Sequence, residues 1–301
     1  MTPMALQSAT PRIRPMPIEL KPYDPTQAEQ LARWHDQQPG YEAELGETVP
    51  LADAARGNGR QALVAWQGGT LLGYVGWVLL GVPQDGCAYG SPLVASDIRA
   101  ATLLVDAVRR ACRQAGASRL RISARQVERT KRQALEAAGF TPLFDFVHLE
   151  ASLPLGGLAE LPNGLRSVPF REIDWSKAQA CYAETFAGVP NAPTPEVDVM
   201  QEEWSQADWR ASCVLADDVG DYQAFLLVTD GEVDAVGVRA GWRGRELAAI
   251  LYRRAGPALL AQGITTLRSM VASTNHASLG LHRKLGFCEH MPAWTVYEAH
   301  L

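Results

Sequence analysis

The sequence predicts an α/β or α+β fold that occurs twice in the chain, each time as a sheet with helices on both faces. Two observations lead to this prediction. Residues of the same type recur at a constant spacing of 147 positions, and the two halves show the same order of strand-like and helix-like signals. The length of 301 residues also suits two domains, because single cores usually hold about 100 to 200 residues. We therefore expect one domain over residues 16–150 and a second over residues 163–301.

The spacing is clearest at Gly139-Phe140 and Gly286-Phe287, each of which ends an apolar, helix-like stretch. The same spacing relates Ile18 to Leu165, Pro22-Tyr23 to Pro169-Phe170, Gly73 to Gly220, Gly90 to Gly237, Gly116 to Gly263, and Leu120 to Leu267. Turn glycines and buried apolar residues are the positions that a backbone constrains most. The register therefore predicts two copies of one fold without net insertion; the alternative is coincidence among common residue types.

Each half shows an extended segment, a helix, a long irregular stretch, two or three strands, a long amphipathic helix, a strand, a helix ending in Gly-Phe and a last strand. In the first half the segments preceding the Gly-Phe helix are expected at 18–20, 25–37, 61–66, 71–80, 100–115 and 120–123. In the second half they are expected at 165–168, 175–186, 211–216, 222–228, 233–238, 246–261 and 266–271. A segment rich in Pro and Gly, residues 153–164, connects the halves.

The composition excludes several classes of protein. The net charge of −5 disfavours a nucleic-acid-binding surface, which needs clustered positive charge. The longest apolar run, residues 71–82, is shorter than the roughly 20 residues that cross a bilayer, and residues 1–20 lack the apolar centre of a secretory signal. We therefore expect a cytoplasmic protein that binds neither nucleic acid nor membrane. The five cysteines are scattered without a C-x-x-C spacing, which predicts reduced, mostly buried thiols and no metal site.

Two motifs follow each other in the second half. One runs from Val236 through Arg243-Gly244-Arg245-Glu246-Leu247-Ala248 into the long helix, and the other runs from Asn275 to Gly286-Phe287. Together they resemble the GNAT acetyltransferase superfamily, in which a strand ends in valine, a Gln/Arg-x-x-Gly-x-Gly/Ala loop opens a helix, and an Asn-led helix ends in Gly-Phe. The resemblance implies two tandem GNAT folds, each a mixed, mostly antiparallel sheet flanked by helices, with acetyl-CoA as co-substrate.

The loop around Gly244 has the chemistry of an anion site. A helix N-terminus carries unpaired backbone N–H groups and a partial positive charge, which suit the pyrophosphate of coenzyme A. Gly244 allows close backbone approach, and Arg243 and Arg245 can add charge-assisted contacts. Glu246 stands where the family has glycine; we expect its carboxylate in the first helical turn, where it competes with phosphate. The alternative is a helix capped by its own glutamate beside surface arginines.

Other roles follow from the resemblance. The N–H of Val238 is expected to donate to the thioester carbonyl, and Asn275 to bond the pantetheine arm, unless Asn275 only caps its helix. The predicted cofactor-binding residues are Val236, Val238, Arg243, Gly244, Arg245, Glu246, Leu247, Ala248 and Asn275.

His282 stands where the family often has a tyrosine that protonates the thiolate. An imidazolium with a pKa near ~6.5 can protonate a thiolate whose conjugate acid is near ~8.5. The alternative is a partly exposed histidine beside an apolar face formed by Leu281 and Leu285.

Glu232 is the candidate general base. Glu232 and Asp234 alternate on the strand that leads to Val238, so we expect the three residues on one face. Some family members carry a catalytic carboxylate at the position of Glu232; the alternative is a hairpin turn followed by solvated acids. By the same resemblance, Tyr182 and residues 189–195 are expected in the region that lines the acceptor pocket.

The first half is a degenerate copy by this reasoning. Its aligned loop, Ser96-Asp97-Ile98-Arg99-Ala100-Ala101, has no glycine, and Glu128 and Leu135 stand at the positions of Asn275 and His282. The resemblance thus implies an acetyl-CoA-dependent N-acetyltransferase, monomeric or homodimeric, that acts on an amine of a small molecule in a pocket between the halves. The alternatives are a catalytically inactive CoA-binding or scaffold protein, and a transferase for a larger acyl group. The acidic charge mildly favours a cationic acceptor.

Overall fold

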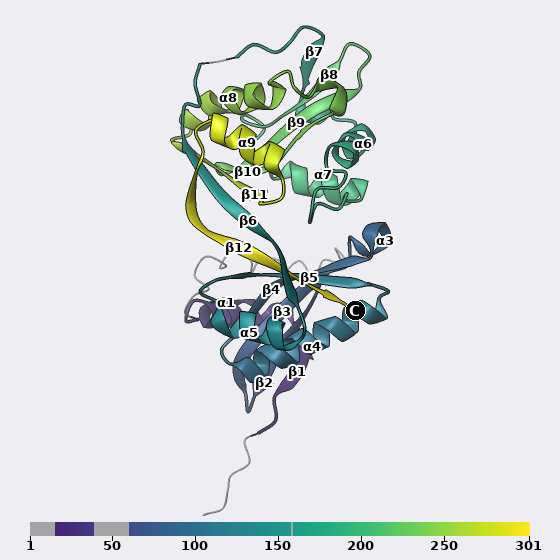
Figure 1. The fold of residues 1–301 in the computed structure, drawn as a ribbon, viewed down its shortest axis with the longest axis vertical. Helices are drawn as coiled ribbons and strands as arrows, with labels where there is room; N and C mark the ends of the chain where they lie inside the picture. The colour runs from purple at the N-terminus through teal and green to yellow at the C-terminus, as the bar shows by residue number, and fades with distance from the viewer. Residues whose placement is uncertain (1–15, 39–59, 158) are drawn as a thin grey trace, which may run out of the picture.

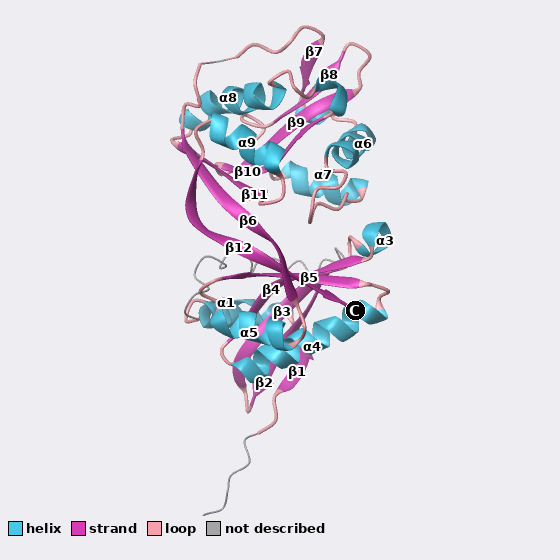
Figure 2. Ribbon diagram, viewed as in Figure 1, coloured by secondary structure: helices cyan, strands magenta, loops and turns pink. Residues whose placement is uncertain are grey.

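Both halves of the chain contribute to one twisted sheet of twelve strands, whose order is β1-β2-β3-β4-β5-β12-β6-β11-β10-β9-β8-β7. The computed structural model describes residues 16–38, 60–157 and 159–301. The irregular stretch expected after the first helix falls largely on residues 39–59, outside the described residues. Two strand pairs, β4 with β5 and β10 with β11, are parallel, and the other pairs are antiparallel. The mixed, mostly antiparallel α/β architecture predicted from the sequence is therefore confirmed (Figure 2).

The first half contains six strands and four α-helices among its described residues. The strands are β1 (Glu19–Pro22), β2 (Arg60–Gln67), β3 (Thr70–Val78), β4 (Cys87–Ala95), β5 (Arg119–Arg125) and β6 (Thr141–Ser152). The helices are α1 (Ala28–His35), α3 (Val82–Asp85), α4 (Ile98–Gln114) and α5 (Arg129–Ala137). Helix α4 begins where the Asp97 carboxylate accepts hydrogen bonds from the amides of Arg99 and Ala100, both at 2.9 Å. It ends before Gly116, whose φ of 86° is the left-handed conformation of a helix C-terminus.

The second half repeats this series. Its strands are β7 (Leu165–Val168), β8 (Cys213–Asp217), β9 (Tyr222–Thr229), β10 (Glu232–Val238), β11 (Thr266–Ala272) and β12 (Cys288–His300). Its helices are α6 (Trp175–Thr185), α7 (Val197–Ser205), α8 (Leu247–Leu260) and α9 (His276–Lys284), with a 3-10 turn η5 (Ala240–Trp242) before α8. Strands β5 and β11, helices α5 and α9, and strands β6 and β12 each begin 147 positions apart. Gly73 and Gly220 do not correspond, because Gly73 lies inside β3 whereas Gly220 lies in the turn before β9.

The last strand of each half crosses into the sheet of the other half. Strand β6 pairs with β11 from Phe146 to Ser152, and β12 pairs with β5 from Trp294 to His300. Between these regions β6 and β12 pair with each other, side by side across the middle of the molecule (Figure 1). The pattern of apolar residues does not reveal this exchange, because it shows which face of a strand is buried and not which strand lies beside it.

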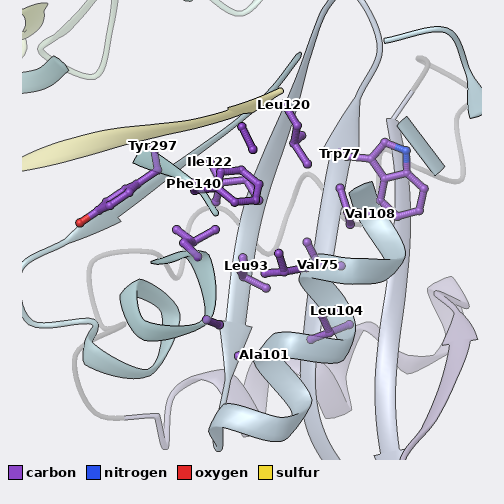
Figure 3. Packing of buried hydrophobic residues seen from close by; sticks show 14 of the residues in the cluster. Val75, Trp77, Leu93, Ala101, Leu104, Val108, Leu120, Ile122, Phe140 and Tyr297 are labelled. Carbon is purple, nitrogen blue, oxygen red and sulfur yellow. The ribbon is translucent and has the colours of Figure 1, made fainter. Parts of the chain in front are cut away.

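The core of the first half depends on this exchange. Helices α4 and α5 cover one face of the sheet, where Leu104 packs with Val75 and Leu120, while α1 lies on the other face. Tyr297 of β12 is buried among these first-half residues (Figure 3). Burial of one large apolar side chain contributes about 1.5 to 3 kcal/mol, so the end of the chain stabilises its beginning.

The second half has two cores, one on each face of the sheet. Helices α8 and α9 pack on one face, through residues such as Leu251 and Leu279. Helices α6 and α7 pack on the other face, where Met200 and Trp204 lie beside Phe225. The place where β10 and β11 separate, described below, therefore lies between two layers of helices, each with its own core.

All five cysteines are free, and Cys87, Cys112 and Cys181 are buried as small apolar core residues. Within residues 16–38, 60–157 and 159–301, no group of three or more His, Cys, Asp or Glu side chains is arranged to hold a metal ion. None of the helices in the described part of the chain is long and apolar enough to cross a membrane.

Candidate active site

Strands β10 and β11 lie side by side only where they begin. Glu232 pairs with Arg268 and Val233 with Ser269, and the parallel pairing stops there. Beyond this point β10 stays paired with β9 as far as Val238, while β11 stays paired with β6. Along residues 236–238, β10 therefore has no strand partner on its β11 side within the described chain. Such an edge can pair with an extended ligand through backbone hydrogen bonds.

The loop from Arg239 to Glu246 joins the end of this edge to helix α8. The Arg243 guanidinium turns back onto the protein: its Nε donates to the Val238 carbonyl at 2.9 Å and its Nη2 to the Thr185 carbonyl at 3.4 Å. Arg243 thus fixes the end of β10 to the end of α6. The Arg245 guanidinium lies 4.9 Å from the centre of the Trp242 ring, a cation–π contact at the exposed surface of the loop.

Glu246 immediately precedes the first residue of α8 and does not lie in the first helical turn, which corrects the sequence-based expectation. Its φ of 55° and ψ of 16° are left-handed, and its side chain makes no capping hydrogen bond. A residue with a Cβ pays about 1 to 2 kcal/mol for this conformation, which explains on physical grounds why a glycine suits the position.

The N-terminus of α8 is open. The amides of Leu247, Ala248 and Ala249 donate to no other group among the described residues, whereas the next amide, of Ile250, donates to the Glu246 carbonyl at 3.0 Å. The Leu247 side chain is buried, so this residue offers the loop only its backbone. Three free amides at the positive end of a helix, next to the exposed Gly244, form a site that suits phosphate oxygens.

Asn275 caps helix α9. Its side-chain oxygen accepts a hydrogen bond from the Ser278 amide at 3.1 Å, which is the capping role that the sequence left open as the alternative. The asparagine lies three residues after the end of β11 and directly before the first residue of α9.

His282 lies in the core and is 1% exposed. Its Nδ1 is 2.8 Å from the Ser278 carbonyl, which can only accept, so Nδ1 carries the proton. Its Nε2 then accepts from the Tyr252 hydroxyl at 2.8 Å. Burial lowers the pKa of His282 and favours this neutral form. A neutral imidazole with both nitrogens engaged joins α9 to α8 and is not positioned to protonate a leaving group.

The sequence placed the buried face of α9 incorrectly. Leu279 and His282 are its buried residues, with Leu285 directly after the helix, whereas Leu281 is only half-buried. The difference is a modest rotation of α9 about its axis, which two leucines alone do not determine. His282 therefore packs between the Tyr252 and Phe287 rings, at centroid distances of 5.4 and 4.9 Å.

Glu232 lies at the start of β10, exposed, with its carboxylate 3.7 Å from Nη1 of Arg268. Val238 lies six positions further along the strand, a distance of about 20 Å. A β-bulge between Val233 and Ala235 also reverses the alternation of side chains. As a result Glu232 shares a face with Phe225, and Val238 lies on the opposite face, contrary to the expectation that Glu232, Asp234 and Val238 share one.

A cavity of about 360 Å³ lies between the two halves. The first half lines it with Gln84, Asp85, Tyr89 and Arg121, and the second half with Ala183 and residues 186–194. Its volume is within the range of small-molecule sites. The sequence placed residues 189–195 beside an acceptor pocket, and residues 189–194 line this cavity. No sequence signal identified the first-half residues.

Aromatic rings connect this cavity to β10. Phe186 lines the cavity and stacks on Tyr182, with ring centroids 4.5 Å apart, and lies 6.2 Å from the Phe225 ring. A Cβ on Gly237 would come within 2.5 Å of Phe225 and 2.6 Å of the Thr185 hydroxyl. Gly237 therefore lets β10 lie directly on the aromatic wall, so the cavity and the open strand edge are on adjoining parts of the second half.

Comparisons with solved structures define the class of fold. A GCN5-related N-acetyltransferase from Sphaerobacter thermophilus is 18% identical, with a TM-score of 0.68, over 95% of this chain and 96% of that chain. A tandem GNAT protein from the clavulanic acid biosynthesis pathway is 16% identical, with a TM-score of 0.68, over 94% and 98%. A putative acetyltransferase from Pyrococcus horikoshii is 12% identical, with a TM-score of 0.64, over 98% and 93%. The fold is thus that of tandem GNAT proteins.

A family model gives a narrower result for the second half. Residues 175–287, from the start of α6 to the end of the Gly-Phe motif, match the acetyltransferase (GNAT) family. This segment, which contains the loop and the open helix N-terminus, is a GNAT acetyltransferase domain. Comparison with curated proteins gives no match.

Proposed function

We propose that this protein is an acetyl-CoA-dependent N-acetyltransferase that transfers an acetyl group to an amine of a small molecule. The observation that carries the proposal is the position of the open N-terminus of α8 beside the unpaired edge of β10 at residues 236–238. Both features lie in the segment that matches the GNAT family.

The residues present suit coenzyme A. The amides at the start of α8 and the exposed backbone at Gly244 would hold the pyrophosphate, and the Arg245 guanidinium would add positive charge. The backbone of Val236 and Val238 would bond the pantetheine arm as an added strand. Bound acetyl-CoA would supply an activated acyl group, whose carbonyl the Val238 amide would polarise.

The proposal assigns the catalytic work to backbone groups and to the position of the acceptor. His282 is neutral and buried, and Glu232 lies on the far part of β10, so neither side chain takes a proton-transfer role. The cavity between the halves would hold the acceptor beside the aromatic wall at Phe186. A polar cavity open to water allows the acceptor ammonium to lose its proton to solvent.

Titration calorimetry with acetyl-CoA tests the cofactor site. Gly244→Asp adds a negative charge and a Cβ at a φ of 75°, and should weaken binding at least tenfold. Gly263→Asp is the matched control, because Gly263 follows the other end of α8 with a φ of 81° and open space around it. Absence of binding by the unaltered protein at high micromolar acetyl-CoA would refute the proposal, as would equal losses in the two variants.

A second candidate, binding of coenzyme A without acetyl transfer, is favoured by the burial of His282 at the position where the family often has its tyrosine. Release of the CoA thiol with spermidine, glucosamine or L-lysine as acceptor separates the two. Turnover with any of these amines supports transfer, whereas binding without thiol release supports the second candidate.

A further inference from the structure

The loop between α6 and α7 belongs to the second half but is attached to the first. The Gln84 side chain makes two hydrogen bonds with the backbone of Thr194: its Nε2 donates to the carbonyl at 2.7 Å, and its Oε1 accepts from the amide at 3.0 Å. The Arg121 Nη1 donates to Oδ1 of Asn191 at 2.9 Å. Three hydrogen bonds therefore hold residues 191–194 against the first half.

The anchoring residues lie on regular elements of the first half. Gln84 lies on α3, which projects from the first half toward the second (Figure 1) and ends at Gly86 in a left-handed conformation, φ 75°. The Arg121 side chain is 11% exposed, and its Nε donates to the Glu298 carboxylate on β12 at 2.8 Å. The loop thus contacts a fixed surface, one part of which is built by the exchanged strand.

The anchored loop forms one wall of the cavity between the halves. Residues 186–194 face Tyr89, Asp85 and Arg121 across a space of about 360 Å³. Asn191 adopts a φ of 56°, a left-handed conformation that turns the loop at the point where Arg121 binds it. The separation of the two walls is therefore set where Gln84 and Arg121 bind the loop.

We propose that Gln84 and Arg121 of the first half determine acceptor specificity by fixing the width of the pocket that serves the second half. The proposal rests on the proposed acetyl transfer, with the cavity as the acceptor site. It gives the first half a role in the reaction that needs no cofactor loop. The acceptor is a compact polar amine that fits between Asp85 and Tyr89 on one wall and the backbone of the loop on the other.

Four variants test the anchoring. Gln84→Leu removes two hydrogen bonds at nearly constant size, and Asn191→Gly removes the third while glycine accepts the left-handed backbone. Asn191→Asp keeps an acceptor for Arg121 and tolerates the same φ, so the loop amides should exchange at the wild-type rate. Gln114→Leu, at the exposed last residue of α4, is the control for exchange of a glutamine.

Hydrogen exchange and kinetics provide separate readouts. In the Gln84→Leu/Asn191→Gly double variant, we expect the amides of residues 186–194 to exchange at least tenfold faster, with an unchanged unfolding midpoint. The KM of the preferred amine among glucosamine, L-lysine and spermidine should rise about fivefold to tenfold, and the preference for that amine over the bulkier kanamycin should fall, because each lost hydrogen bond weakens loop closure severalfold. The affinity for acetyl-CoA should change less than twofold.

Unchanged exchange in the loop would overturn the proposal, and so would equal changes in the acceptor KM and the acetyl-CoA affinity. Faster exchange with unaltered amine preference would also overturn it, because the loop would then be anchored without shaping the site. If the wild type binds acetyl-CoA but acetylates none of the amines, the proposed transfer and the specificity role both fail. If transfer occurs and only the amine preference is insensitive to the variants, the specificity role alone fails.

Discussion

Glycine at position 246 should tighten acetyl-CoA binding about twofold to fivefold and change stability little. The Glu246 backbone is left-handed, with φ 55° and ψ 16°, which costs a residue with a Cβ about 1 to 2 kcal/mol. Glycine removes that cost, but it gives the unfolded chain more conformational freedom, which lowers the free energy of unfolding by about 0.4 to 1 kcal/mol. It also removes the attraction between the carboxylate and the helix end, which contributes about 0.3 to 1 kcal/mol. The free energy of unfolding should therefore stay within about 1 kcal/mol of its original value.

The affinity change comes from the same attraction. A phosphate bound at the start of α8 must compete with the Glu246 carboxylate for the helix end. Removal of that carboxylate should therefore make the free energy of binding more favourable by about 0.3 to 1 kcal/mol. Calorimetry at low ionic strength measures the effect, because salt screens exposed charges. Glu246→Gln separates charge from backbone strain, and Glu136→Gln, an exposed acid on α5, is the control. A glycine variant that binds acetyl-CoA no more tightly than the wild type refutes the reasoning.

The remaining predictions concern stability. His282→Phe should lower the free energy of unfolding by about 1 to 3 kcal/mol, because it removes the hydrogen bonds of the imidazole with the Tyr252 hydroxyl and the Ser278 carbonyl; a tenfold loss of kcat at unchanged stability would instead indicate that His282 acts as a general acid. Gly237→Ala should cost about 1 to 3 kcal/mol through its clash with the aromatic wall, whereas Gly280→Ala, in open space on α9, should stabilise by up to about 1 kcal/mol in denaturant titrations. Thermal unfolding should show stability falling from about pH 6.5 to about pH 4, because burial lowers the pKa of His148 to about 4 and also lowers that of His282, so the unfolded chain binds more protons in this range. His148→Gln should flatten that slope, and an unaltered slope would contradict the assignment.

The repeat spacing predicted the elements whose positions depend on local turns. Helices α5 and α9 begin 147 positions apart, and the glycines that follow them, Gly139 and Gly286, have φ values of 80° and 88°. The spacing of 147 fails in the middle strands of each half, which precede these helices. Strands β3 and β9 end 151 positions apart and β4 and β10 end 143 apart, so the insertion and the deletion cancel. In the strand pairs Gly90 lies opposite Ile122, whereas the residue opposite Ser269 is Val233, so Gly90 and Gly237 are not equivalent.

The sequence predicted the chemistry of the site better than it predicted the positions of the side chains. The composition around Gly244 predicted an anion site, because a helix N-terminus needs no distant partner to form one. The burial of His282 could not be predicted, since it depends on the rotation of α9 against α8. The bulge after Val233 and the contacts of Gln84 and Arg121 with a loop 110 and 70 positions away arise only when strands and halves assemble.

The exchange of β6 and β12 has a consequence for how the chain can be divided. Cleavage in the connection at residues 153–164 would not release two independent domains. The last strand of each fragment would stay paired with a strand of the other fragment. A polypeptide of residues 163–301 alone would present β12 without β5 and β6, and two such copies could satisfy each other by the same exchange. Joining the copies in one chain makes that association intramolecular, so the pairing of the two halves does not depend on protein concentration and both halves should unfold in one transition.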